Sequence, residues 1–158
     1  MIGNDEFWMR TAIAAAVEAE GLGEVPIGAC LIDGNSRLLA VAGNRTRTLC
    51  DPTAHAEILV LREAAQKIGN YRLTETTLYT TIEPCAMCAG ALIQARVARL
   101  VFGAHDIRFG AVESVFQLCD TSSLNHQMEI TNGVLADPCK KLMQDFFRHK
   151  RREGKIKD

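Results

Sequence analysis

The sequence predicts an α/β fold, and three observations support this prediction. Segments with the apolar periodicity of helices alternate with short apolar runs typical of strands. A strand-like run at 77–82 is followed by a helical segment and then by another strand-like run at 99–103, the order of a right-handed βαβ unit. The composition, 47% apolar and 23% charged over 158 residues, is that of a globular chain and not of a disordered one. We therefore expect one domain spanning 1–158.

The N-terminal part of the chain predicts a helix followed by a hairpin. Asn4 or Asp5 can cap a helix that ends at Gly21. The apolar runs 25–32 and 37–42 are joined by an Asp-Gly-Asn-Ser turn, which favours two antiparallel strands.

A polar and basic loop at 43–51 leads into a second predicted helix. Asp51, which is followed by a proline, or Thr53 can cap this helix, and Gly69 ends it. His55 would then lie in its first turn.

The remaining elements alternate in the same way. They are a strand at 77–82, a helix at 85–94, a strand at 99–103, a short strand at 128–131 and a last helix at 137–152. The connection 104–127 is long for a compact domain, and connections of that length are often functional.

The chain is close to neutral, because 18 basic residues face 19 acidic ones and leave a net charge of −1. This balance excludes a uniformly basic nucleic-acid binder, so an anionic partner would be met by a local patch. From residue 136 onward, eight lysines and arginines stand against four acidic residues, a net charge of +4. This segment fits either the steering of RNA phosphates or a solvated tail.

The sequence predicts a cytoplasmic protein that does not enter a membrane. Its first residues are acidic where a signal peptide is basic, and the apolar run 12–17 is too short to span a bilayer. Without a secretion signal, the six cysteines are expected to be reduced thiols.

Three residues have the chemistry and spacing of metal ligands. Cys85 and Cys88 are three residues apart at the start of a predicted helix, and His55 lies in the first turn of another. One nitrogen and two sulfur donors suit tetrahedral zinc, and three protein ligands leave the fourth position open, as in catalytic zinc sites. Glu57 would lie about 200° from His55 around an ideal helix, so it is free to move protons beside that position.

Other interpretations of this pattern remain open. A lone Cys-x-x-Cys is also found in redox dithiols, or as two buried cysteines. A structural zinc would need a fourth ligand, for which Cys50, His105 and Cys119 are candidates. The His-x-Glu sequence upstream and the proline before Cys85 favour a zinc site over a redox dithiol or two buried cysteines, and a structural zinc stays the main alternative.

Two stretches around these residues resemble the zinc-deaminase signature of the cytidine/deoxycytidylate deaminase superfamily: Pro-Thr-Ala-His-Ala-Glu-Ile at 52–58 and Glu-Pro-Cys-Ala-Met-Cys-Ala-Gly at 83–90. Within this superfamily the chain is most similar to the bacterial tRNA-specific adenosine deaminases. The stretches that carry this similarity are 25–29, 70–73, 101–104, 128–130 and 145–148.

The resemblance implies a three-layer cytidine-deaminase-like fold, in which helices cover both faces of a five-stranded mixed sheet. It implies a homodimer whose active sites lie near the interface. It also implies hydrolytic conversion of adenosine to inosine at the wobble position of a tRNA, with the anticodon stem-loop as the partner.

The resemblance also implies roles for residues around the metal. His55, Cys85 and Cys88 would hold Zn2+. Glu57 would shuttle protons, and the backbone amide of Ala56 would assist near the reacting carbon.

Four further residues are candidates for substrate binding. By resemblance, Asn44 would contact the flipped base and Asp106 the sugar, although the first also suits a turn and the second a loop cap. On the last helix, Phe147 and Arg148 are the candidates. Phe146 continues the apolar stripe and is expected in the core, whereas Phe147 lies off the stripe and is the better base-stacking residue.

The sequence leaves two rival functions open. One is a small-molecule deaminase of the same fold that acts on cytosine or guanine compounds. The other is an inactive RNA-binding subunit that carries zinc. Glu57 argues against the second, because binding alone would not require it.

Overall fold

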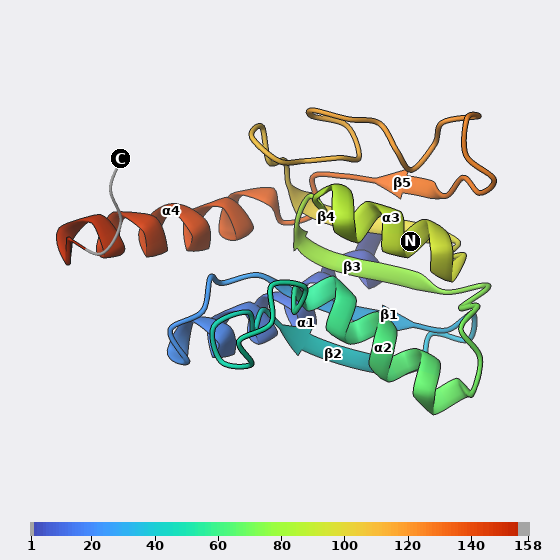
Figure 1. The fold of residues 1–158 in the computed structure, drawn as a ribbon, viewed down its shortest axis with the longest axis horizontal. Coiled ribbons are helices and arrows are strands. Elements are labelled where there is room, and N and C mark those ends of the chain that lie inside the picture. The colour runs from blue at the N-terminus through green and yellow to red at the C-terminus, as the bar shows by residue number, and fades with distance from the viewer. Residues whose placement is uncertain (1, 155–158) are drawn as a thin grey trace.

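The computed structural model describes residues 2–154 (Figure 1). Its elements in chain order are α1 (Ile2–Gly21), β1 (Gly28–Ile32), β2 (Leu38–Gly43), α2 (Ala56–Ile68), β3 (Thr77–Ile82), α3 (Ala86–Ala95), β4 (Arg99–Ala104), β5 (Glu129–Thr131) and α4 (Ala136–Arg152). The predicted order of helices and strands is confirmed.

The five strands form one mixed sheet in the order β2-β1-β3-β4-β5. β1 pairs antiparallel with both β2 and β3, whereas β3, β4 and β5 run parallel to one another. Because α3 connects the parallel neighbours β3 and β4, it completes the predicted βαβ unit. The α/β class and the five-stranded mixed sheet are therefore confirmed.

Helices cover both faces of the sheet, because successive strand residues point to opposite sides. On one face, Leu78 and Leu100 pack in a core with residues of α2 and α3. On the other, Tyr79 and Val101 pack with residues of α1 and α4. Figure 1 shows α2 and α3 in front of the sheet and α1 behind it, which gives the three layers.

α1 lies very close to β1. A Cβ atom at Gly28 would be 2.0 Å from the carbonyl oxygen of Ala12 and 2.5 Å from the backbone nitrogen of Ala16. Only glycine leaves room for the helix backbone at this distance. This contact fixes α1 against the sheet, and small residues of α1 make it possible.

The expected cap of the first helix is wrong. The helix begins at Ile2, so Asp5 lies inside it, where it is 4% exposed. Its carboxylate accepts hydrogen bonds from the Tyr79 hydroxyl and the Arg99 guanidinium instead of from the backbone of its own helix. Partners from β3 and β4, which are far away in sequence, therefore take the place of the cap.

The second helix also begins later than predicted. The Asp51 carboxylate accepts hydrogen bonds from the backbone amide and hydroxyl of Thr53, both 2.8 Å long, and forms a local turn. This turn competes with helix formation, and α2 starts only at Ala56. His55 is consequently the N-cap and not part of the first turn.

The first strand is shorter than the predicted run 25–32, since β1 begins at Gly28. The Ile27 amide bonds to the Val25 carbonyl in a tight local turn, and the Gly28 amide donates to the Thr81 hydroxyl. Residues 25–27 thus lead into the sheet and do not extend it.

The cysteines and the helices test two expectations about the chain as a whole. All six cysteines are free thiols. Within residues 2–154, no helix combines the length and the apolar content that crossing a bilayer demands.

Candidate active site

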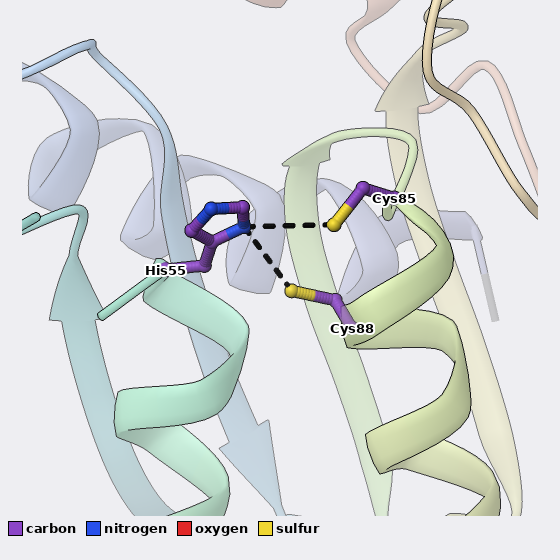
Figure 2. A group of neighbouring side chains, drawn as sticks. All are labelled: His55, Cys85 and Cys88. Carbon is purple, nitrogen blue, oxygen red and sulfur yellow. Dashed lines mark hydrogen bonds between the residues drawn. The ribbon is translucent and has the colours of Figure 1, made fainter. Parts of the chain in front are cut away.

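Two helix N-termini bring the three predicted ligands together. His55 is the N-cap of α2 and Cys85 the N-cap of α3, both with extended backbones (φ −71°, ψ 151° and φ −75°, ψ 177°). Neither side chain caps its helix. Both are instead directed toward a shared point, where Cys88 joins them from the first turn of α3 (Figure 2).

The spacing of the donor atoms fits a metal. The Nδ1 atom of His55 lies 3.6 Å from the sulfur of Cys85 and 3.4 Å from that of Cys88. Zinc bonds of roughly 2.0 Å to nitrogen and 2.3 Å to sulfur, set at tetrahedral angles, would place these atoms roughly 3.5 Å apart. The three donors therefore fit one zinc ion with little movement.

The charges in this cluster also favour a cation. Hydrogen bonds from Cys88 and His55 lower the pKa of the Cys85 thiol to about 4, and the same contact with Cys85 raises the pKa of His55. The contact with Cys85, together with burial, raises the pKa of the Cys88 thiol. Without a cation, the two adjacent sulfurs cannot easily carry a negative charge at the same time. A divalent cation would compensate both charges.

Glu57 lies in the first turn of α2, is 4% exposed, and has an Oε1 atom that forms no hydrogen bond with the described residues. A buried carboxylate oxygen without a protein partner is uncommon and is typical of a group that acts on a bound ligand or water. Burial raises the pKa of this carboxyl. The angle of 200° expected between His55 and Glu57 assumed a regular helix at His55, which the extended N-cap replaces.

A cavity of about 380 Å³ opens beside the cluster, within the range of roughly 300–1,000 Å³ typical of small-molecule sites. Among the predicted site residues, its walls include His55, Ala56, Glu57 and Cys85, together with Asn44 and Asp106. Ala56 is the first residue of α2, where backbone amides have no partner within the helix. The structure thus places six predicted residues around one cavity.

The two polar candidates in the walls also form local contacts. Asn44 is 6% exposed and lies 3.5 Å from the Thr46 hydroxyl. Asp106 accepts hydrogen bonds from the amides of Arg108 and Phe109, so it caps its loop as well as facing the cavity.

The candidates on α4 lie farther away. Phe147 lines a second cavity of about 310 Å³, which shares four lining residues with the first: Ile82, Asp106, Phe109 and Met143. Arg148 is exposed and lines neither cavity; its guanidinium lies 3.5 Å from the Asp145 carboxylate. Phe146 is 8% exposed and belongs to the core, as predicted.

The alternative fourth ligands do not reach the cluster. Among the His, Cys, Asp and Glu side chains that the structure describes, the three predicted donors form a group whose ligand atoms all lie within 4.8 Å of one another, and no fourth side chain joins this group. Cys119 is in the core, Cys50 is exposed, and His105 contacts Glu113 at 3.0 Å. One side of the cluster is therefore left without a protein donor.

Several residues of the cavity walls were not predicted as site residues. They are Val25, Ile27, Thr46, Ile82, Glu83, Phe109 and Met143. The signal in the sequence that could have identified Glu83 is its position directly before the proline of the cysteine motif. Phe109 lies in the long connection and is 68% exposed, which its sequence context does not distinguish from an ordinary loop residue.

Each of the two loops that line the cavity is anchored by a buried carboxylate. Glu24 is fully buried, and its carboxylate accepts hydrogen bonds from the amides of Arg47 and Thr48 in the loop that follows Asn44. Burial alone would raise the pKa of Glu24, but these bonds outweigh it and leave that pKa below its ordinary value. Glu83 does the same for the opposite loop.

This combination of fold and donor cluster is the one on which the nucleobase deaminases with a His/Cys/Cys site are built. A family model of MafB19-like deaminases matches residues 3–151. The tRNA-specific adenosine deaminase of Haemophilus influenzae is 48% identical over 152 residues, covering 96% of this chain and 88% of the relative. That of Bacillus subtilis is 44% identical, covering 96% and 93%.

Solved structures agree with these relatives. A structure from work on A-to-I editing by deaminases acting at the wobble position of transfer RNA matches with a TM-score of 0.83 and 41% identity, covering 86% of this chain and 98% of the other. A guanine deaminase from Nitrosomonas europaea matches with a TM-score of 0.77 and 25% identity, covering 89% and 83%. The chain belongs to the deaminase family that includes the tRNA-specific adenosine deaminases.

Proposed function

We propose that this protein converts adenosine to inosine by hydrolysis at the wobble position of a tRNA anticodon. The observation that carries the proposal is the cluster of His55, Cys85 and Cys88, which is open on the side of a cavity that also contains Glu57. The adenosine substrate and the wobble position come from the relatives, whose names and described activity agree with each other.

Zinc would be held by His55 Nδ1 and the sulfurs of Cys85 and Cys88, whose donor types and distances fit it. When bound, zinc supplies a Lewis acid that makes water a nucleophile near neutral pH. The N-terminal positions of Cys85 and Cys88 on α3 assist, because the helix dipole favours the thiolate forms.

Glu57 would transfer the protons. Its carboxyl group is buried beside the cluster and faces the cavity, where it can take a proton from the attacking water. It would deliver that proton to the ring nitrogen of adenine, then take the second proton from the hydroxyl group added at C6 and pass it to the amino group, which leaves as ammonia. Burial raises its pKa, which suits a carboxyl group that must hold a proton for part of the cycle.

The walls of the cavity would bind the flipped nucleotide. Asn44 would contact the base and Asp106 the sugar, and the Ala56 amide would assist near the reacting carbon. Phe147 in the adjoining cavity would stack on a neighbouring base of the anticodon loop. Arg148, which is exposed on α4, would meet the RNA backbone at the surface. The enzyme would act in the cytoplasm.

The decisive experiment offers an anticodon stem-loop with adenosine at the wobble position and measures inosine by mass spectrometry. We expect inosine from this RNA and little ammonia from free guanine or cytosine. Ammonia from guanine or cytosine without inosine in the RNA would support a small-molecule deaminase instead, and activity on guanine would match the guanine deaminase of Nitrosomonas europaea. A homodimer stays a prediction, which light scattering can test against the chain mass of 17.3 kDa.

A further inference from the structure

The carboxylate of Glu83 accepts an unusual number of backbone hydrogen bonds. The side chain is 3% exposed, and Oε2 accepts from the amides of Val112, Glu113 and Ser114 at 3.1, 2.8 and 2.9 Å. Oε1 accepts from the amide of Asp106 at 3.1 Å and from the Ser114 hydroxyl. A single buried carboxylate thus gathers both ends of the 106–114 segment.

The fit around this carboxylate is tight. A Cβ atom at Gly110 would lie 2.3 Å from Cδ of Glu83 and 2.5 Å from the carbonyl oxygen of Asp106, so the loop passes the carboxylate where no larger residue fits. The backbone adds two more links, because the Glu83 amide donates to Ala104 and the Ala111 amide donates to Pro84, both at 2.8 Å. The segment has little freedom to move relative to Glu83.

Glu83 also stands at a fixed distance from the donor cluster along the chain. It follows the last residue of β3 and precedes Pro84 and Cys85, the N-cap of α3. The segment that it holds carries Asp106 and Phe109, two walls of the cavity beside that cluster. Glu83 therefore connects the metal-binding helix to the opposite wall of the substrate cavity.

The partners of Glu83 suit this role. All of the groups that bond to its carboxylate are donors, namely four backbone amides and the Ser114 hydroxyl. Backbone amides pointing at one carboxylate form strong, charge-assisted hydrogen bonds.

We propose that Glu83 is a positioning residue for substrate binding: it holds Asp106 and Phe109 at the distance from His55, Cys85 and Cys88 that a nucleotide needs. This inference rests on the proposed deaminase function. Glu83 acts through the loop and not on the reacting atoms, so its loss weakens substrate binding more than it slows chemistry.

The kinetic test compares Glu83→Gln with the wild type and with Glu63→Gln, the same change at an exposed position of α2. The amide group of glutamine carries no charge, and its N–H donors would face the backbone N–H donors of the loop. We expect KM for the anticodon stem-loop to rise about tenfold, with kcat within about threefold of the wild type. Glu63→Gln should match the wild type in both constants, and zinc content should be equal in all three proteins.

A fall in kcat at unchanged KM would overturn the proposal, because Glu83 would then act on the chemistry. Loss of zinc from Glu83→Gln would also overturn it, since the carboxylate would then support the metal-binding helix. If Glu83→Gln fails to fold, Ser114→Ala removes one hydroxyl donor to the same carboxylate. It should raise KM in the same direction by a smaller factor, and an unchanged KM would count against the proposal.

Hydrogen exchange gives a measurement that does not depend on activity. In Glu83→Gln the amides of Val112, Glu113 and Ser114 should exchange about tenfold faster, while those of α2 stay unchanged. Unchanged exchange in the loop would refute the positioning role, even if inosine is formed. If the wild type forms no inosine, the deaminase proposal fails, and exchange still decides whether Glu83 holds the loop.

Discussion

The guanidinium of Arg99 and the carboxylate of Asp5 form two parallel hydrogen bonds, 2.8 and 2.7 Å long, between residues that are 94 positions apart. The Tyr79 hydroxyl adds a third bond to the same carboxylate at 2.9 Å. This network joins α1 to β3 and β4 at the face of the sheet opposite α2 and α3. Bidentate geometry and burial make it stronger than a surface ion pair.

Replacing Asp5 with alanine should destabilise the fold by about 3 kcal/mol, because it leaves the mostly buried Arg99 without its main partner. Chemical denaturation measures this change directly. The control is Glu6→Ala on the same helix, which removes an exposed pair with Arg10 at 3.7 Å and should cost about 0.5 kcal/mol. Equal effects of the two substitutions would show that the buried network does not stabilise the fold.

The same carboxylate predicts how stability depends on pH. Burial alone would raise the pKa of Asp5, but hydrogen bonds from Arg99 and Tyr79 outweigh it and leave the pKa below its ordinary value. The unfolded chain therefore binds a proton more readily, so the stabilisation is complete above about pH 4 and is lost as the pH falls through the lower, folded-state pKa. Urea denaturation between pH 6 and pH 3 should show this loss, and Asp5→Asn should show a smaller one.

Glu57→Ala should abolish turnover while the metal stays bound, because Glu57 is not one of the three donors of the cluster. General acid–base groups contribute about 10²–10⁴-fold, so we expect the rate of inosine formation to fall at least by that factor. Single-turnover assays together with zinc analysis check both parts. Retained turnover would remove Glu57 from the mechanism.

Cys88→Ser should release zinc and lower the melting temperature, since the serine hydroxyl is a poor zinc ligand and Cys88 is a fully buried member of the donor cluster. Cys50→Ser is the matched control, because Cys50 is exposed and lies outside the cluster. Elemental analysis should find about one zinc per chain in the wild type and the control. Zinc retained at full occupancy in Cys88→Ser would contradict the assignment of this ligand.

Gly28→Ala should destabilise the fold by about 1–3 kcal/mol, because its Cβ would meet the backbone of α1 at 2.0 Å. Gly90→Ala in α3 is the control: apart from its chain neighbours and the backbone of its own helix, no described atom lies within 4 Å of the new Cβ. Alanine is also the better helix former, so Gly90→Ala should stabilise by about 0.5–1 kcal/mol. Opposite shifts in melting temperature are expected, and a neutral Gly28→Ala would show that α1 can move away from β1 without cost.

The sequence predicts the donor cluster better than it predicts the elements that carry it. Cys85 and Cys88 are three residues apart at the start of a helix, and this short spacing keeps their sulfurs in one cluster even though Cys85 is the N-cap and not the first helical residue. The position of His55 as an N-cap depends on the local turn at Asp51, whose side chain has two alternatives, a helix cap or the observed turn. Choosing between such local alternatives requires the tertiary structure.

Long-range partners explain the other differences between prediction and structure. Asp5 has the residue type of a cap, and only the approach of Arg99 and Tyr79 from the sheet gives it another partner. The role of Glu83 leaves even less trace in the sequence, because its partners are mostly backbone amides, which every residue except proline possesses.

The loops that enclose the cavity and the helices that carry the donors are separate parts of the chain. Glu24 and Glu83 each hold one loop by backbone amides, so most side chains on those loops take no part in anchoring them. Such positions can be exchanged while the donors at the ends of α2 and α3 keep their places. We therefore expect that changes in the loop sequences, whether by evolution or by design, can alter which base the cavity accepts while the donor cluster stays the same.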